Sequence, residues 1–383
     1  MEFNFTLFFR VTYLSLFESQ ATNARLTWKR VGGLGAFYIL FIPTQLINWI
    51  CFGLDHLLFP GFRRIQVRQP VFIVGNPRSG STHLLRVLAR DEETFACAKL
   101  GEMLLAPSII QRKLVRKVIR LDRRLGSPVR KLVLAWQERA FRRSDQYHRI
   151  RLHEPDEDEF NLVPIFSAIH LVFPFPFMDE FARYVRFDTE VGRAERKRFM
   201  AFYRRSMQRT LYMHGPTKRF LSKSPANSGR IATLQETFPD ARFIYTTRRP
   251  MELVPSLMSL LTFQWQAFCD PLEEHPFRNS TLAMTKHWYD YTTRQLEQGP
   301  ASSYLVVRYD DLVGDLDRTI TRIYAEFQFQ ITPQYVAALQ EEVEKARRYE
   351  SRHEYSLAEM GLTREQIAVE YRDVIARFGF DAA

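Results

Sequence analysis

A largely apolar stretch covers Val31–Leu54 and contains no charged residue. Its length exceeds the roughly 20 residues that a helix needs to cross a bilayer. Trp28 and Trp49 lie near its ends, where aromatic side chains meet the membrane interface. Pro43 interrupts its middle, so a helix lying in the interface is the alternative, and a buried core helix is a third. The pattern favours an N-terminal membrane-associated segment, residues 1–64.

After the first 70 residues the pattern changes to short apolar runs separated by longer amphipathic stretches. The runs suit buried parallel strands and comprise Val71–Val74, Phe243–Thr246 and Tyr304–Val307. The amphipathic stretches suit helices and include Thr82–Arg90, Gly229–Phe238 and Leu312–Phe329. Strands that alternate with helices predict an α/β fold, with a mostly parallel sheet covered by helices on both faces. We assign residues 65–383 to this domain.

A basic amphipathic stretch, Gln111–Arg124, stands apart from this pattern. Its apolar residues fall on one helical face: Leu114, Val115, Val118, Ile119 and Leu125. Such a helix can lie on an anionic membrane surface. A solvated helix that packs one stripe on a protein core has the same pattern, and the sequence leaves both interpretations open.

The chain of 383 residues has a formal net charge of +11 and contains 32 phenylalanines. The charge indicates an anionic partner, whether a phosphate-bearing ligand, a membrane surface or a nucleic acid. The abundant Phe fits apolar pockets or lipid contact better than a polynucleotide groove. Cys51, Cys97 and Cys269 have no zinc-binding spacing and are typical of free thiols in a reducing compartment. This favours the cytoplasmic face of a membrane, although a Golgi-type anchored protein would have a similar layout.

The segment VFIVGNPRSGSTH, which begins at Val71, runs from a predicted strand through a loop into a predicted helix. Gly75 and Gly80 bound the loop and permit a tight backbone. The side chains able to donate to an anion follow in order: Arg78, Ser79, Ser81 and Thr82. Strand, loop and helix together aim backbone N–H groups and the positive helix end at a phosphate. The segment therefore predicts a P-loop-like phosphate site.

This loop lacks two features of nucleotide kinases and hydrolases. Their motif would place a lysine where Ser81 stands. No aspartate suited to Mg²⁺ follows the run Phe243–Thr246, which continues instead into Thr247, Arg248 and Arg249. Cations in place of a metal-binding acid indicate that side chains neutralise the ligand, so we expect no metal.

Taken together, these segments resemble the sulfotransferases that use 3′-phosphoadenosine 5′-phosphosulfate (PAPS), in the bacterial-type branch with a Pro-Arg-Ser-Gly-[Ser/Thr]-Thr loop. Three further segments match that family's pattern in order: Phe220–Pro250, Tyr304–Asp315 and His353–Ile367. The first segment contains Lys-Ser-Pro, Phe-Pro-Asp-Ala and Arg-Arg-Pro. The second contains Tyr-Asp-Asp-Leu, and the third contains Tyr-Ser-Leu and Gly-Leu. The resemblance covers roughly residues 68–380, and the loop with Phe220–Pro250 is its most specific part.

The resemblance implies that Arg78–Thr82 hold the 5′-phosphosulfate. Arg78 occupies the position of the family's catalytic lysine, where a cation stabilises the leaving oxygen. Lys223 is expected near the sulfuryl group. Arg248 and Ser256 match the spacing of the family's 3′-phosphate site, and the arginine after Arg248 is a second candidate.

The general base is not identified by the same motifs. The cytosolic branch has a catalytic histidine where Pro225 stands here. Branches that act on sugars use a glutamate shortly after the phosphate-loop helix, and Glu102 fits that place. A carboxylate there could accept the acceptor's hydroxyl proton, although a lone glutamate is more often simply solvated. His153 is the second candidate.

Other segments receive weaker interpretations. The acidic run Glu154–Glu159 is expected to be a solvated loop. Leu171–Phe177 (LVFPFPF) is either a wall or lid for an apolar acceptor or core filling. His353 and Tyr355 help to close the site, on resemblance alone.

These features predict a metal-independent transfer of a sulfuryl group from PAPS to a hydroxyl of a lipid, sterol or carbohydrate. The membrane is an expected partner, and nucleic acid is not, because no nucleic-acid-binding motif is present. The alternatives are a nucleotide kinase or hydrolase and a catalytically inactive membrane-bound nucleotide-binding protein.

Overall fold

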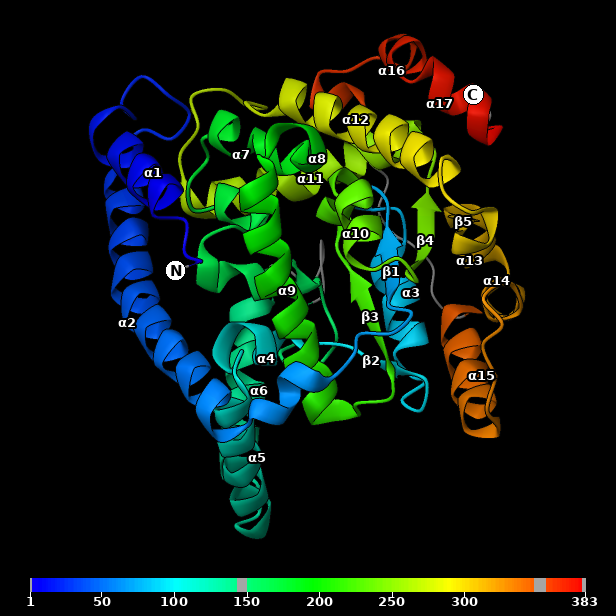
Figure 1. The fold of residues 1–383 in the computed structure, drawn as a ribbon. Coiled ribbons are helices and arrows are strands. Elements are labelled where there is room, and N and C mark those ends of the chain that lie inside the picture. The colour runs from blue at the N-terminus through cyan, green and yellow to red at the C-terminus, as the bar shows by residue number, and fades with distance from the viewer. Residues whose placement is uncertain (1, 143–149, 348–355, 381–383) are drawn as a thin grey trace.

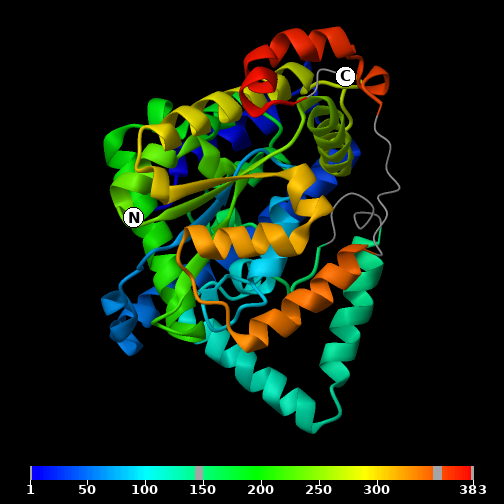
Figure 2. The same cartoon turned by 90° about the vertical axis from the view of Figure 1, so that its right-hand side faces the viewer.

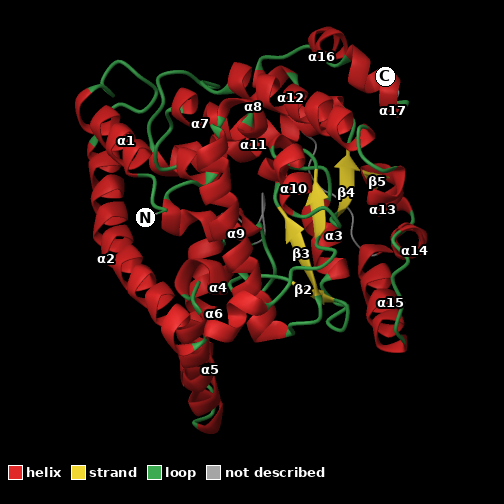
Figure 3. Ribbon diagram, viewed as in Figure 1, coloured by secondary structure: helices red, strands yellow, loops and turns green. Residues whose placement is uncertain are grey.

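The computed structural model of the chain describes residues 2–142, 150–347 and 356–380. Within these residues one parallel sheet has the strand order β2-β3-β1-β4-β5, and helices cover both of its faces (Figure 1 and Figure 3). The strands are β1 (Val71–Val74), β2 (Phe95–Ala96), β3 (Arg219–Lys223), β4 (Arg242–Thr247) and β5 (Tyr304–Arg308). The predicted α/β fold is confirmed.

The helices follow the chain around this sheet. The first half contains α1 (Phe5–Phe17), α2 (Trp28–Leu58), α3 (Ser81–Leu88), α4 (Leu100–Leu105), α5 (Ile109–Arg124), α6 (Pro128–Phe141), α7 (Met178–Val185) and α8 (Phe187–Glu190). The second half contains α9 (Arg193–His214), α10 (Ile231–Thr237), α11 (Pro250–Phe268), α12 (Arg278–Glu297), α13 (Tyr309–Gly314), α14 (Leu316–Glu326), α15 (Pro333–Arg347), α16 (Arg364–Glu370) and α17 (Arg372–Phe378). Short 3₁₀ helices are η1 (Pro60–Arg64), η2 (Asp158–Ile165), η3 (Ile169–Val172), η4 (Pro225–Gly229), η5 (Ala301–Ser303) and η6 (Ala358–Met360).

The apolar runs predict β1, β4 and β5 but not the other two strands. β2 is two residues long, and β3 begins with Arg219 and ends with Lys223, so neither forms an apolar run. The predicted helix Leu312–Phe329 divides into α13 and α14. Asp315 separates them, because its side chain accepts a hydrogen bond from the backbone N–H of Arg318 (3.0 Å) and starts a new helix.

The pleat of β1 distributes its side chains between two cores. Val71 and Ile73 pack with residues of α3 and of α13 to α15. Phe72 and Val74 face the larger core, which α7 to α12 build on the opposite face of the sheet. All four side chains are fully buried, as an interior parallel strand requires.

The N-terminal helices belong to the larger core on one side only. Leu7 and Val11 of α1 and Leu34 and Phe41 of α2 are buried in it. The outer face of α2 exposes apolar side chains: Ile39, Leu40, Ile42, Leu46, Ile47 and Ile50. Among the described residues α2 is the one helix long and apolar enough to cross a membrane. The division into residues 1–64 and 65–383 stays a prediction.

The turn that leaves β1 depends on Gly75. Its φ is +127°, and a Cβ built there would lie 2.2 Å from the carbonyl oxygen of Thr246 on β4. Gly75→Ala should therefore lower the free energy of unfolding by about 1–3 kcal/mol, as measured by urea denaturation. Gly53→Ala is the control, because Gly53 lies inside α2 with open space around it. Equal stability of the two variants would contradict the tight turn.

Candidate functional site

The loop between β1 and α3 has the conformation that an anion-binding turn needs. Gly75, Arg78 and Gly80 all have positive φ, and Gly80 in the left-handed region forms the N-cap of α3. The hydroxyl of Ser79 donates to the carbonyl of Asn76 (2.6 Å) and contacts the hydroxyl of Thr246 (2.7 Å). Ser79 thus fixes the loop internally. The first N–H groups of α3 have no partner within the helix and point out of its N-terminus.

Three of the residues predicted for nucleotide binding lie together beside this loop. Arg78 Nε donates to Ser256 Oγ (2.9 Å), and Arg248 Nη1 donates to the carbonyl of Arg78 (3.1 Å). The guanidinium of Arg248 lies 4.1 Å from the ring centroid of Tyr309 and pairs with Glu252 (3.0 Å). Arg248 follows β4, and Ser256 lies on α11, so the sheet edge and the helix after it assemble this basic corner.

Lys223, at the end of β3, forms the second part of the site. Its side chain is 2% exposed and forms an ion pair with Glu157 Oε1. The other oxygen of Glu157 lies 3.1 Å from Nε2 of His170. Because an ionised carboxylate only accepts hydrogen bonds, Nε2 must carry the proton. Nδ1 of His170 is buried and has no hydrogen-bond partner among the described residues.

Lys223, Glu157 and His170 form a triad, and its contacts shift the pKa values of Glu157 and His170. Burial alone would raise the pKa of Glu157, but Lys223 and His170 outweigh it and hold that pKa well below its usual range. Burial would lower the pKa of His170, but the hydrogen bond and charge of Glu157 raise it above the ordinary value of 6.5. Glu157 is therefore an anion at neutral pH, and the pKa of His170 lies above its ordinary value.

The expectation that Glu154–Glu159 is a solvated loop is wrong. Asp158 and Glu159 are 2% and 1% exposed, and η2 begins at Asp158. Glu159 forms a two-pronged ion pair with buried Arg230 (2.6 and 2.8 Å). The cation that pairs with Glu159 is 71 residues away along the chain, and the cation that pairs with Glu157 is 66 residues away. A local pattern therefore cannot reveal that these acids are buried.

Asp158 differs from its two neighbours because it faces hydroxyls instead of cations. Tyr203 donates to one of its oxygens, and the hydroxyl of Ser222 donates to the other (3.1 Å). Burial raises the pKa of Asp158 to about 7, although these hydrogen bonds oppose the shift. The three successive acids thus serve three roles: contact with Lys223, attachment of η2 to β3, and pairing with Arg230.

An apolar cavity of about 290 Å³ is lined in part by Glu157 and His170. Its lining also includes Pro77 of the loop, Pro225 and Asp156. Its apolar walls include Leu100, Leu104, Ile150, Leu152, Phe160, Met178, Leu257, Leu261, Trp265 and Met284. Val172 and Phe173 of the segment LVFPFPF line it as well, whereas Leu171 and Phe175 fill the core. The segment thus both lines the cavity and fills the core, and contact with an acceptor stays a prediction.

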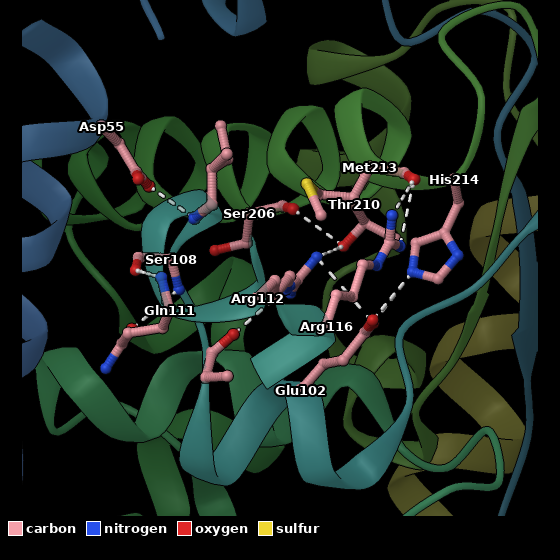
Figure 4. A network of polar contacts seen from close by, with 12 residues as sticks. Asp55, Glu102, Ser108, Gln111, Arg112, Arg116, Ser206, Thr210, Met213 and His214 are labelled. Carbon is pink, nitrogen blue, oxygen red and sulfur yellow. Dashed lines mark hydrogen bonds and ion pairs between the residues drawn. The ribbon is translucent and has the colours of Figure 1, made fainter. Parts of the chain in front are cut away.

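Glu102 lies in a different environment from the triad. On α4, Leu100 and Leu104 face the cavity, and Glu102 is on the opposite side of the helix. Figure 4 shows its carboxylate directed at His214 (2.9 Å) and at buried Arg112 (3.9 Å). Burial would raise the pKa of Glu102, but Arg112 and His214 lower it to about 2. The structure therefore does not bring Glu102 together with Lys223.

Three other residues are predicted from the sequence to lie at the site, namely His153, His353 and Tyr355. His153 is exposed and is not among the residues that line the cavity. His353 and Tyr355 lie outside the described residues. Glu157 and His170 are the functional candidates that sequence reasoning missed, and the only local signal for them is an acidic run followed directly by an apolar one.

Comparison with protein families gives one match. A family model described as "Sulfotransferase family" matches residues 70–333, which include the loop, Lys223 and the basic corner.

Curated relatives match over most of the chain. The Mycobacterium bovis protein "Omega-hydroxy-beta-dihydromenaquinone-9 sulfotransferase Stf3" is 25% identical over 358 residues, which cover 90% of this chain and 84% of the relative. The protein of the same name from Mycobacterium tuberculosis matches equally.

Solved structures share the fold. Sulfotransferase STF9 from Mycobacterium avium aligns with a TM-score of 0.73 at 19% identity, covering 100% of this chain and 98% of that chain. Sulfotransferase STF1 from Mycobacterium tuberculosis aligns with a TM-score of 0.71 at 17% identity, covering 95% and 90%.

The buried pair of Glu159 and Arg230 should hold the acidic run in place. Both side chains are at most 1% exposed, so Glu159→Gln leaves an uncompensated buried guanidinium. We expect the free energy of unfolding to fall by about 3–5 kcal/mol in urea denaturation. Glu297→Gln is the control, because it breaks an exposed pair with Arg377 (3.2 Å) and should cost at most about 1 kcal/mol. Equal losses in both variants would contradict this role.

Proposed function

The chain belongs to the sulfotransferase family, and we propose that it transfers a sulfuryl group from PAPS to a hydroxyl of a lipid acceptor. One observation carries this proposal: the apolar cavity is lined by Pro77 of the phosphate loop and by the pair of Glu157 and His170, and Glu157 also forms an ion pair with Lys223. A hydroxyl at the tip of a long apolar molecule would reach the donor there, while the rest of the molecule occupies the apolar walls.

The residues beside β1 fit the donor's two anionic groups. The loop Arg78–Thr82 and the N-terminus of α3 suit the 5′-phosphosulfate, because backbone N–H groups bind phosphate oxygens. Arg248 and Ser256 suit the 3′-phosphate, and a planar guanidinium can bind two of its oxygens at once. Thr247 Oγ1 is buried at the same sheet edge without a partner among the described residues, which leaves a donor available for a ligand.

The transfer itself requires one bond to form and one to break. The acceptor oxygen attacks sulfur in line, and the bond from sulfur to the bridging phosphate oxygen breaks. Arg78 and Lys223 stabilise the negative charge that develops on the leaving oxygen. The acceptor's proton goes to Nδ1 of neutral His170, and Glu157 stabilises the resulting imidazolium through Nε2.

A lipid is the favoured acceptor class. The relative Stf3 is named for a hydroxylated menaquinone derivative, an apolar molecule that carries a hydroxyl. Most of the residues that line the cavity are apolar, which supports a lipid over a carbohydrate. A sterol also carries one hydroxyl on an apolar body, and competition between a polyisoprenoid alcohol and a sterol would separate the two.

A metal-dependent nucleotide kinase is the competing function. Among the described residues no group of three or more His, Cys, Asp and Glu side chains is arranged to hold a metal ion. Metal independence stays a prediction, and turnover in EDTA tests it: a sulfotransferase retains activity, whereas a kinase loses it. A position on the cytoplasmic face of the membrane also stays a proposal, which the three free cysteines support.

Arg248→Ala should weaken the binding of 3′-phosphoadenosine 5′-phosphate by about 10- to 100-fold in calorimetry, because hydrogen bonds to a charged group are lost. Its affinity for ADP should change much less, since ADP lacks the 3′-phosphate. Arg322→Ala, at an exposed position on α14, is the matched control. If wild-type protein prefers ATP, or binds no nucleotide without Mg²⁺, the loop has been misread and the kinase becomes the better interpretation.

The dependence of kcat/KM on pH should report on His170. The imidazole must be neutral to accept a proton, so activity should rise with pH through an apparent pKa above 6.5. In Glu157→Gln this limb should move below 6.5, because the anion is gone while burial still disfavours the charged imidazole. His170→Asn should lower kcat by about 10²- to 10⁴-fold.

Glu102→Gln separates the two candidate bases. If His170 accepts the proton, this variant keeps most of its turnover and an unchanged pH profile. A large loss of kcat in Glu102→Gln, with normal turnover in His170→Asn, would assign the base to Glu102 instead.

A further inference from the structure

The helical hairpin of α5 and α6 projects from the body of the protein (Figure 1 and Figure 2). From Leu114 to Ala140 every residue is exposed except Asp122, Ser127, Leu134 and Gln137. A soluble helix normally buries one apolar stripe against its neighbours. This hairpin instead presents its apolar side chains to the surroundings.

The exposed surface of the hairpin combines apolar and basic side chains. Its exposed large apolar residues are Leu114, Val115, Val118, Ile119, Leu121, Leu125, Val129, Leu132, Val133 and Trp136. Residues 113–141 contain nine Lys or Arg and only two Asp or Glu. Apolar and cationic side chains on one helical element are typical of segments that bind the surface of an anionic bilayer.

Polar contacts fix the base of the hairpin to the body (Figure 4). Asp55 of α2 accepts hydrogen bonds from the N–H groups of Ile109 (2.9 Å) and Ile110 (3.0 Å), and Ser108 caps the same end. Buried Arg112 donates to the carbonyl of Ala106 (3.1 Å). The first turn of α5 is therefore held in place, and the exposed remainder extends from a fixed base.

The turn of the hairpin is also defined. The carboxylate of Asp122 accepts hydrogen bonds from the N–H groups of Val129 (2.8 Å) and Arg130 (3.0 Å) at the start of α6. This single buried acid ties the end of α5 to the first turn of α6. The exposed apolar side chains are thus carried by two ordered helices.

The base of the hairpin is flanked by residues that line the apolar cavity. Leu104 lines the cavity shortly before α5, and Ile150 and Leu152 line it after α6. The side chain of Gln137 on α6 accepts a hydrogen bond from the N–H of Leu152 (2.9 Å). A surface that holds the hairpin would therefore lie beside the cavity wall.

α2 continues this surface along one edge of the molecule. In Figure 1, α2 and α5 follow one another on the same side, and Asn48 bonds to Gln111 where they meet (2.9 Å). The inner face of α2 carries buried Arg30 and Asp55, which lipid could not solvate. Its outer face is apolar, so α2 is suited to lie along a membrane.

We propose that the α5–α6 hairpin, with the outer face of α2 beside it, docks the protein onto a bilayer rich in anionic lipid. The cations contact lipid phosphates, and the apolar side chains enter the boundary of the acyl chains. Docking itself is independent of the catalysed reaction. That the docked cavity admits its acceptor directly from the bilayer rests on the proposed function.

The charge of the hairpin disfavours the other occupants. Pairing with a second copy would bring two sets of nine cations together, which repel one another. A nucleic acid would satisfy the cations but leave the ten apolar side chains in water. An anionic bilayer satisfies both kinds of side chain.

Sedimentation with vesicles tests the proposal on the full-length chain. We expect binding to vesicles of phosphatidylcholine with phosphatidylglycerol and at least tenfold weaker binding to phosphatidylcholine alone. The triple variant Arg120→Glu/Arg123→Glu/Arg124→Glu should weaken binding by at least about 100-fold, because each cation near an anionic surface contributes severalfold. Reversal of Arg318, Arg322 and Arg364, which are exposed on α14 and α16, is the matched control.

A second pair of variants tests the apolar contribution. Leu121→Ser/Leu125→Ser/Leu132→Ser should weaken vesicle binding by at least about tenfold. Val313→Ser/Ile331→Ser/Val336→Ser removes exposed apolar residues elsewhere on the protein and should leave vesicle binding unchanged. Unchanged thermal unfolding and unchanged nucleotide affinity show that each variant is folded.

Several outcomes would overturn the proposal. Hairpin variants that bind vesicles as tightly as the wild type would do so, as would equal binding to neutral and anionic vesicles. Loss of a dimer or of DNA binding in these variants, without vesicle binding by the wild type, would assign the surface to a second copy or a nucleic acid. Failure of the wild type to bind 3′-phosphoadenosine 5′-phosphate would instead count against the proposed function and leave the vesicle result standing.

Discussion

The parallel register of β1 with its two neighbours is the constraint on which the site depends. β1 pairs with β3 on one side and β4 on the other, so three strands end at the same edge of the sheet. Their carboxyl ends deliver the phosphate loop, Lys223 and Arg248 to one place, as parallel sheets do where the strand order reverses. Gly75 makes this possible, because its backbone passes Thr246 more closely than any side chain would allow.

Glu157 and Glu159 lie close together in the sequence but have different environments and different roles. Glu159 and Arg230 are fully buried. Removal of either partner would leave an uncompensated buried charge and destabilise the fold. Glu157, two residues earlier, is partly exposed, lines the cavity and contacts both Lys223 and His170. The packing of η2 against β3 thus converts an acidic sequence into one structural acid and one acid able to take part in chemistry.

The cavity and the hairpin are connected by the chain itself. α4 and the segment from Ile150 line the cavity, and the hairpin is inserted between them. A protein that accepts an apolar substrate has a physical reason to dock where that substrate is dissolved, because moving a long apolar molecule through water is unfavourable. The exposed apolar helices and the apolar cavity are therefore two consequences of one substrate class under the proposed function.

The sequence by itself determined the features that depend on neighbours in the chain. The apolar runs identified β1, β4 and β5, and the glycines identified the tight turn between β1 and α3, because strand and turn preferences are local. The amphipathic pattern of Gln111–Arg124 identified α5 but not whether its apolar face is covered.

The tertiary structure alone decided the direction and burial of single side chains. Glu102 turns away from the cavity because α4 presents Leu100 and Leu104 to it instead. Glu159 is buried and Glu157 is largely covered, because cations 71 and 66 residues away neutralise them. No local pattern carries that information, since the free energy of a buried charge depends on partners that only the fold brings within reach.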